Sequence, residues 1–295
     1  MESVSIIGVG RLGGALALAL SRSGYRIAKL ISRNNPIDEG ILSQFPSGVG
    51  AATIHDRPVI DSDFVVISTG DPEIEAVADI LGPLLTRPTI VFHTSGSFSS
   101  EILAQLRRHG YRVGSLHPLI SVSDPISGSR RFQDGYFCVE GDEEAVAAGR
   151  SIVEAVGGRP FTIAADKKPL YHASGVTAAG HLIALIDISI EMLSKCGLDD
   201  HEAKEILLPL IRSTIENLAV QSPTEALTGS FARGDADAVR RHLEALDNCV
   251  SQNAKNVYLE LGERSAELAD RRGVDRDSLD SIRSLISIAK KNRGC

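Results

Sequence analysis

The stretch VSIIGVGRLGGALALALSRSG, residues 4–24, decides the fold of the N-terminal half of this chain. Its first residues form an apolar run typical of a buried strand. A helix is expected to follow, with Leu12, Leu16 and Leu20 on one stripe and Gly24 at its end. A strand that turns directly into an apolar helix is the opening unit of a parallel α/β sheet.

The glycines between this strand and this helix have G-x-G-x-x-G spacing. Gly8 would allow a tight turn, Gly10 the close approach of a pyrophosphate, and Gly13 close packing of helix on strand. Free N–H groups at the helix start would meet the phosphates. The alternative is a glycine-rich turn that binds nothing, which the strand–helix context disfavours. The cofactor contacts expected in the turn are Gly8, Val9, Gly10, Arg11, Leu12 and Gly13.

The chain continues to alternate strand and helix patterns as far as about residue 166. Strands are expected at 4–10, 25–32, 63–69, 88–96, 111–118, 135–141 and 159–166, and helices at 11–24, 38–45, 71–81, 100–110 and 143–156. Asp71 is expected to cap its helix, with Pro72 in the first turn. This order predicts a Rossmann-type, doubly wound parallel sheet with helices on both faces.

From residue 167 to 295 the sequence predicts an all-helical second domain. Residues 171–197 are expected to form one long apolar helix, and further helices are expected to start at Asp199, Pro223, Asp235 and Asp275 and to stop at Gly197 and Gly273. The middle of the long helix carries very few charges, so it must be buried on most sides. A homodimer formed through these C-terminal helices is the simplest way to bury it.

Composition narrows the classes of partner. The net charge is −7 and no basic block stands out, so neither nucleic acid nor an acidic membrane is an expected partner. The four cysteines are far apart, and the histidines show no metal-ligand spacing, so no metal is expected. No apolar run approaches the ~20 residues of a membrane helix. We therefore expect a cytoplasmic protein that acts on a small molecule.

The end of the second expected strand, LISRNN, indicates which dinucleotide is bound. NAD-preferring enzymes usually place an acid there, and this chain has none before Asp38. Ser32, Arg33 and Asn34 instead offer a cation and short donors, which suit the 2′-phosphate of NADP. NADP is therefore expected over NAD, the alternative being that Arg33 is a solvated loop charge.

Further polar clusters follow the later strands. The loop STGDP is expected to pass under the cofactor, and HTSGS and LHPLIS lie where a nicotinamide would be. His93 and His117 fall at this rim, although for either one alone a structural role is as plausible as a catalytic one. The candidates in these loops are Ser68, Thr69, Gly70, His93, Ser95, Ser97 and His117.

The second domain offers its own candidates. His172, Thr177 and His181 have spacings that place them on roughly one side of the long helix. They could face a substrate or form an internal hydrogen-bond network. In the later segment ALTGSFARGDADAV, Thr228 and Arg233 could hold a substrate carboxylate, while Asp235 is better explained as a helix cap.

The segments VSIIGVGRLGGALALAL, HTSGS, LHPL, YHASGVTAAGHLIAL and LTGSFARGD together resemble a bacterial family of Rossmann-like proteins with a helical C-terminal domain of unknown function. That family is similar in layout to pyrroline-5-carboxylate reductases, ketopantoate reductases and the 6-phosphogluconate and 3-hydroxyisobutyrate dehydrogenase class. The resemblance implies an NADP-binding domain joined to a 6-phosphogluconate dehydrogenase C-terminal-like dimerisation domain. The resemblance also supports a catalytic role for His117. The HP pair after a strand is similar to that of prephenate dehydrogenases, in which the matching histidine assists hydride transfer. The catalytic lysine of the 3-hydroxyacid dehydrogenases is absent here, the nearest lysine being Lys168.

The resulting expectation is an NADP-dependent oxidoreductase that moves a hydride between NADPH and a small carbonyl or imine, possibly a 2-keto acid. Its proton donor would be a histidine with a pKa near neutrality. The catalytic candidates are His117, His172 and His181, with Ser95 and Thr177 orienting the substrate. Two alternatives are a non-catalytic NADPH-binding sensor or interaction protein, and a reductase that uses a deazaflavin cofactor.

Overall fold

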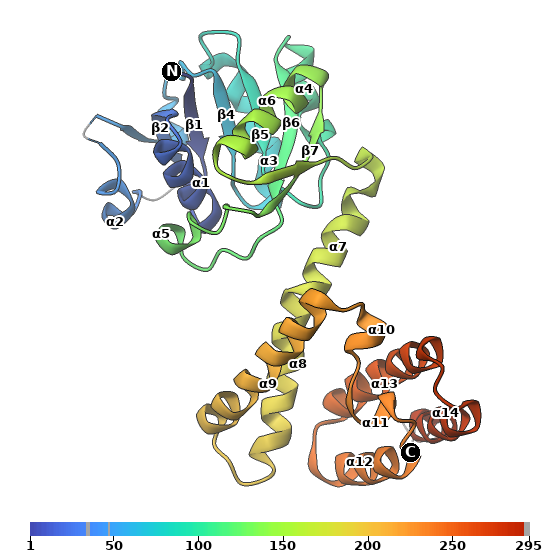
Figure 1. Ribbon diagram of the computed structural model, residues 1–295. Helices are drawn as coiled ribbons and strands as arrows, with labels where there is room; N and C mark the ends of the chain where they lie inside the picture. Colours follow the sequence, from blue (N-terminus) through green and yellow to red (C-terminus); the bar gives the residue numbers. More distant parts are fainter. Residues whose placement is uncertain (34–35, 47, 292–295) are drawn as a thin grey trace. The chain divides into compact units, whose positions relative to one another are not determined.

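The computed structural model describes residues 1–33, 36–46 and 48–291, and the chain divides into two compact units, 1–179 and 180–295. The first unit is built around a β-sheet and the second is helical (Figure 1). The predicted fold class is confirmed. The division falls after α7 (Lys168–Ala178), whereas the predicted domain boundary at residue 166 placed this helix in the second domain.

The first unit contains an eight-stranded sheet with the order β3-β2-β1-β4-β5-β6-β7-β8. The strands are β1 (Ser3–Ile7), β2 (Arg26–Ser32), β3 (Gly50–Thr53), β4 (Phe64–Ile67), β5 (Ile90–His93), β6 (Arg112–Pro118), β7 (Tyr136–Gly141) and β8 (Arg159–Phe161). Register places Ile31, Ile7 and Ile67 level with one another on β2, β1 and β4. The loops that leave these three strands therefore start at the same edge.

Alternation along the strands separates two cores, one on each face of the sheet. Val4 and Ile6 pack with α1 (Arg11–Arg22) and α6 (Glu143–Ala155), while Ile7 and Val65 pack with α3 (Ile74–Leu81) and α4 (Ala104–Arg108). Successive side chains of a strand point to opposite faces, so β1, β2, β4, β5 and β6 each contribute to both cores. The layers are visible in Figure 1.

Two strands run against the predicted direction, because β7 pairs antiparallel to β6 and β8 pairs parallel to β7. The segment between β6 and β7 carries only the short helix α5 (Pro125–Gly128), which packs near α1. A parallel crossover needs a long connection, usually a full helix, to return the chain to the opposite edge of the sheet. Without one, the chain enters β7 from the edge at which β6 ends.

Two local predictions also need correction. The edge strand β3 was not predicted, because its sequence GAAT holds one β-branched residue, Thr53, and no aromatic residue, which is too weak a strand pattern. Asp71 does not cap α3, since a 3₁₀ turn (Asp71–Glu73) precedes that helix and Glu73 is the N-cap residue of α3. The remaining short elements are α2 (Glu39–Leu42) and the 3₁₀ turns Ile54–Asp56, Gly82–Leu84, Ser100–Leu103 and Ala165–Lys167.

The second unit is helical, as predicted. It contains α8 (Gly180–Ser194), α9 (Asp200–Val220), α10 (Pro223–Ala226), α11 (Gly229–Ala232), α12 (Ala236–Cys249), α13 (Gln252–Arg272) and α14 (Arg276–Lys291). Asp199 forms a capping box with Glu202, and Asp235 accepts from the N–H of Ala238, which confirms both as caps. Gly273 ends α13 with φ +89°. Val239, Leu259 and Ile282 lie at the centre of the core shared by α12, α13 and α14.

The long helix predicted at 171–197 is interrupted. A single turn residue, Ala179 (φ −117°, ψ −64°), separates α7 from α8. The residues at 178–180 are small, so their side chains add little packing that would stabilise a continuous helix. The glycine lowers the helix propensity further.

The stretch 165–194 passes a test of length and composition for a membrane-spanning helix, and its most apolar window is uncovered in the structure. This corrects the expectation that no segment approaches that length. A core helix of a soluble protein passes the same test. The absence of a membrane partner stays a prediction.

Candidate functional site

The glycine turn after β1 is held by backbone packing. Gly8 adopts φ +94°, and its N–H donates to the carbonyl of Ile31 at 2.8 Å. A Cβ at Gly8 would lie 2.6 Å from the carbonyl carbon of Ser68, and one at Gly13 would lie 2.0 Å from the carbonyl oxygen of Gly8. Both positions therefore require glycine for the turn itself.

Gly10 differs from the other two glycines, because a Cβ there would meet nothing within 4 Å. It is the N-cap residue of α1, where no side chain caps the helix and the first turn holds no acid. The first N–H groups of the helix thus adjoin open space, as a pyrophosphate site requires. Around it Arg11 is exposed, while Val9 and Leu12 pack partly on the core.

The loops after β2 and β4 flank this turn and carry unpartnered hydroxyls. Oγ of Ser32 and Oγ1 of Thr69 are buried and have no hydrogen-bond partner among the residues that the structure describes. Buried hydroxyls are nearly always paired, so a polar ligand at this edge would satisfy both. Ser68 accepts from the hydroxyl of Thr94 at 3.2 Å, and Gly70 is exposed.

Arg33 lies at the predicted end of β2 and forms an ion pair with Glu73. Its partner comes from the 3₁₀ turn that follows β4. Asn34, the third residue predicted to contact the 2′-phosphate, lies outside the described residues.

The ends of β5 and β6 bring the two rim histidines near each other. His93 pairs in register with Ser115, two residues before His117 on the neighbouring strand. His93 is fully buried, and its Nδ1 accepts from the N–H of Ser95 at 3.1 Å. Burial, aided by the charge of Lys168, lowers the pKa of His93 to about 3. This imidazole is therefore neutral and locked into the loop.

His117 lies at the centre of an aromatic cluster that includes α7. Its Nδ1 is 2.7 Å from the hydroxyl of Tyr171, and its ring meets that of His172 edge-on at 5.9 Å. A Cβ on Gly96 would lie 2.7 Å from Nε2 of His117 and 2.6 Å from Cδ2 of His172. Only glycine lets the β5 loop approach both rings so closely.

The protonation of this pair follows from burial. Burial raises the pKa of Tyr171, so the phenol keeps its proton. Burial is also the main reason that the pKa of His117 falls to about 3, and the charges of Lys168 and His172 add to this. Both groups are therefore neutral, and their contact can be made with the imidazole proton on either ring nitrogen, because a phenol can donate or accept a hydrogen bond. The expectation of a near-neutral pKa for His117 is wrong.

Lys168 is the site residue that the sequence did not reveal. Its side chain is completely buried, and Nζ donates to the carbonyl of Ser95 at 2.9 Å and to Oγ of Ser115 at 2.6 Å. It forms no ion pair within the described part of the chain, and burial lowers its pKa. No spacing distinguishes it from the exposed Lys167 beside it, so only its tertiary contacts could identify it.

Ser95 and Thr177 use their hydroxyls within their own segments. The hydroxyl of Ser95 accepts from the N–H groups of Ser97 and Phe98 at 3.1 Å and so shapes its own loop. Thr177 is exposed and bonds to the carbonyl of Ala173 in its own helix. His181, Thr228 and Arg233 belong to the second unit and are exposed there.

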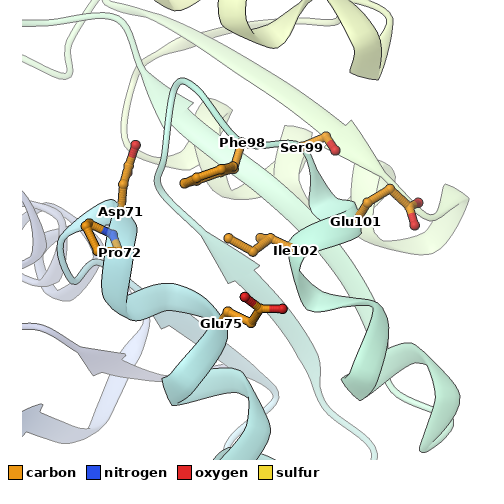
Figure 2. A pocket seen from close by; sticks show the side chains of 7 residues that line it. All are labelled: Asp71, Pro72, Glu75, Phe98, Ser99, Glu101 and Ile102. Carbon is orange, nitrogen blue, oxygen red and sulfur yellow. The ribbon is translucent and has the colours of Figure 1, made fainter.

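A cavity of about 360 Å³ opens between the loops that follow β4 and β5. In Figure 2 Phe98 and Ile102 face Pro72 and Glu75 across it. Its lining residues are Asp71, Pro72, Glu75, Phe98, Ser99, Glu101 and Ile102. Three carboxylates in this lining would repel phosphate, which favours the start of α1 as the phosphate site. Within residues 1–33, 36–46 and 48–291, no cluster of three His, Cys, Asp or Glu side chains could hold a metal.

Two family models match this chain. A Rossmann-like domain matches residues 1–118, and a domain of unknown function, DUF2520, matches residues 135–265. The chain joins a Rossmann-like domain to a DUF2520 domain. This confirms the resemblance found in the sequence motifs. No curated protein matches this sequence.

Solved structures share the fold at low identity. A protein from Thermotoga maritima is 24% identical, with a TM-score of 0.73 over 90% of this chain and 99% of its own. A provisionally assigned NADP oxidoreductase from Bacteroides fragilis is 22% identical, with a TM-score of 0.72 over 90% of this chain and 98% of its own. The pyrroline carboxylate reductase of Plasmodium falciparum, solved with NADP bound, is 13% identical, with a TM-score of 0.57 over 98% of this chain and 97% of its own.

Proposed function

We propose that this DUF2520 protein is an NADP-dependent oxidoreductase that transfers a hydride between NADPH and a small carbonyl or imine substrate. The observation that carries the proposal is the Gly8–Gly13 turn on the same sheet edge as the His117 cluster. The fold shared with an NADP-bound pyrroline carboxylate reductase supports the same class of reaction. The substrate of that relative is a cyclic imine bearing a carboxylate.

The residues present fit the dinucleotide. The open space at Gly10 and the uncapped start of α1 suit the pyrophosphate, and the unpartnered hydroxyls of Ser32 and Thr69 suit the ribose. Arg33 supplies the cation that a 2′-phosphate needs, and this favours NADP over NAD.

When bound, NADPH supplies the hydride, and the chain must handle the matching proton. The Nε2–H of His117 is the donor that we assign to the substrate oxygen or nitrogen. As a neutral imidazole, it polarises that atom by hydrogen bonding before it gives up the proton. A proton from solvent then restores Nε2–H, while the Tyr171 hydroxyl keeps its proton and its hydrogen bond to Nδ1. Lys168 fixes the carbonyl of Ser95 and the hydroxyl of Ser115 beneath this pair.

The second unit supplies the remaining candidate residues of the proposed function. Thr228 and Arg233 would hold a substrate carboxylate, as in a 2-keto acid, and His181 remains a candidate on α8. We also propose a homodimer through the C-terminal helices. Ile183 on α8 is 67% exposed and Leu210 on α9 is 63% exposed, so both helices present apolar surface that a second copy would bury.

The test uses the full chain. NADPH, NADH and a deazaflavin are titrated by fluorescence, and NADPH oxidation is then followed against pooled 2-keto acids and cyclic imines. The proposal predicts tight NADPH binding and turnover that His117→Ala reduces, while His109→Ala, an exposed control, leaves it unchanged. Binding without turnover across the panel would instead indicate a sensor. Preference for the deazaflavin would overturn the cofactor assignment.

A further inference from the structure

The Arg33–Glu73 ion pair joins the two loops that border the expected adenosine site. Arg33 follows β2 and Glu73 follows β4, and these strands flank β1 with Ile31, Ile7 and Ile67 level. The pair therefore connects the two sides of the edge at which the glycine turn leaves β1.

Neither side chain has another hydrogen bond or ion pair with the described residues. The guanidinium is 52% exposed and the carboxylate 32%, so both can be reached from solvent. The hydroxyl of Ser32, one residue before Arg33, and that of Thr69, four residues before Glu73, are the unpartnered groups of the same two loops. A ribose that bound to these two hydroxyls would place its 2′-substituent beside the Arg33–Glu73 ion pair.

Phosphate and carboxylate bind a guanidinium in the same way, through paired N–H donors. A 2′-phosphate can use Arg33 fully only after Glu73 has left it. The displaced carboxylate would then lie beside a dianion and repel it. NADH lacks this phosphate and would be affected much less.

We propose that Glu73 is a specificity-determining residue, which competes with the 2′-phosphate of NADP for Arg33 and thereby lowers the preference for NADPH over NADH. This inference rests on the proposed function. It assigns to Glu73 a role opposite to that of Arg33 in the same site.

The test measures dissociation constants of NADPH and NADH by fluorescence titration, without any substrate. In Glu73→Gln the affinity for NADPH should rise about three- to tenfold and that for NADH by less than about twofold. Glu75→Gln removes a carboxylate from the neighbouring turn, which is not paired with Arg33, and is the matched control. It should change the affinity for NADPH by less than about twofold.

A double-mutant cycle isolates the competition. Arg33→Ala should weaken NADPH binding, and adding Glu73→Gln to that variant should restore at most about twofold. Equal effects of Glu73→Gln and Glu75→Gln on a wild type that binds NADPH would overturn this inference while the proposed function stands. Weaker NADH binding in Glu73→Gln would overturn it too, since Glu73 would then hold the ribose directly. A wild type that binds neither dinucleotide would overturn both proposals.

Discussion

The hydroxyl of Tyr171 on α7 lies 2.7 Å from Nδ1 of His117 at the end of β6. The phenol keeps its proton and the imidazole is neutral. In the tautomer that we propose, the phenol donates to Nδ1 and the imidazole proton lies on Nε2 of His117. Two residues 54 positions apart in the chain thus define a single hydrogen-bond donor at the rim of the sheet.

This arrangement predicts the effects of removing either partner on turnover. His117→Ala should lower kcat by about 10²–10⁴, the usual value of a positioned proton donor. Tyr171→Phe should lower it about tenfold, since Nε2–H remains but its tautomer is no longer fixed. Steady-state kinetics with the best substrate of the panel measures both. A His117→Ala enzyme with wild-type kcat would transfer the donor role to His172.

The pH profile of turnover is a separate prediction. Because the pKa of His117 is lowered to about 3, the donor stays neutral from pH 5 to pH 8. The turnover rate of the wild type should therefore show no step near pH 6.5 that is due to His117. Any step near that pH should persist in His117→Gln. Such a step would show that His117 titrates as an ordinary exposed histidine.

Folding stability should fall in mild acid. His93 and His117 bind protons in the unfolded chain below about pH 6.5 but in the folded chain only near pH 3. The stability contributed by their neutral forms is therefore complete above pH 6.5 and is lost as pH falls toward 3. Each of these two histidines should lower the free energy of unfolding by up to about 2 kcal/mol between pH 7 and pH 5. Urea unfolding at both pH values measures this, and His117→Gln should reduce the difference by about that amount, whereas His109→Gln should not.

Lys168 should matter for stability as well as for the site. Lys168→Met keeps most of the side-chain volume but leaves the carbonyl of Ser95 and the hydroxyl of Ser115 without this donor. We expect a loss of about 1–3 kcal/mol in the free energy of unfolding. Lys167→Met is the control, because Lys167 is exposed and, among the described residues, pairs only with its neighbour Asp166. Equal unfolding free energies for the two variants would contradict the role given to Lys168.

Subunit association gives a further prediction. Light scattering coupled to gel filtration should find a dimer for the wild type and a shift toward monomer for Ile183→Glu. Val59→Glu changes a similarly exposed apolar residue of the first unit and should leave the dimer intact. A monomeric wild type, or a dimer that tolerates Ile183→Glu, would contradict assembly through the C-terminal helices.

Features that depend on near neighbours in sequence were predictable. The strand–turn–helix at residues 4–24 follows from glycine spacing and leucine periodicity, and the caps Asp199 and Asp235 follow from local side-chain chemistry. The rim position of His93 and His117 followed from one rule about parallel sheets.

Features set by tertiary contacts were not predictable. The direction of β7 depends on how its connection crosses the edge of the sheet, and the pKa of His117 depends on burial by α7. Lys168 and Glu73 are ordinary charged residues in the sequence. Their contacts with Ser115 and Arg33 arise only when distant segments meet.

The most direct test of the central claim is the affinity for NADPH of Gly10→Ala compared with the wild type. A Cβ at Gly10 meets no protein atom within 4 Å, so the fold and the free energy of unfolding should change little. The methyl group would occupy the space assigned to the pyrophosphate, and the affinity should fall at least about tenfold. A Gly10→Ala protein that binds NADPH as tightly as the wild type, or a wild type that does not bind NADPH, would contradict the account.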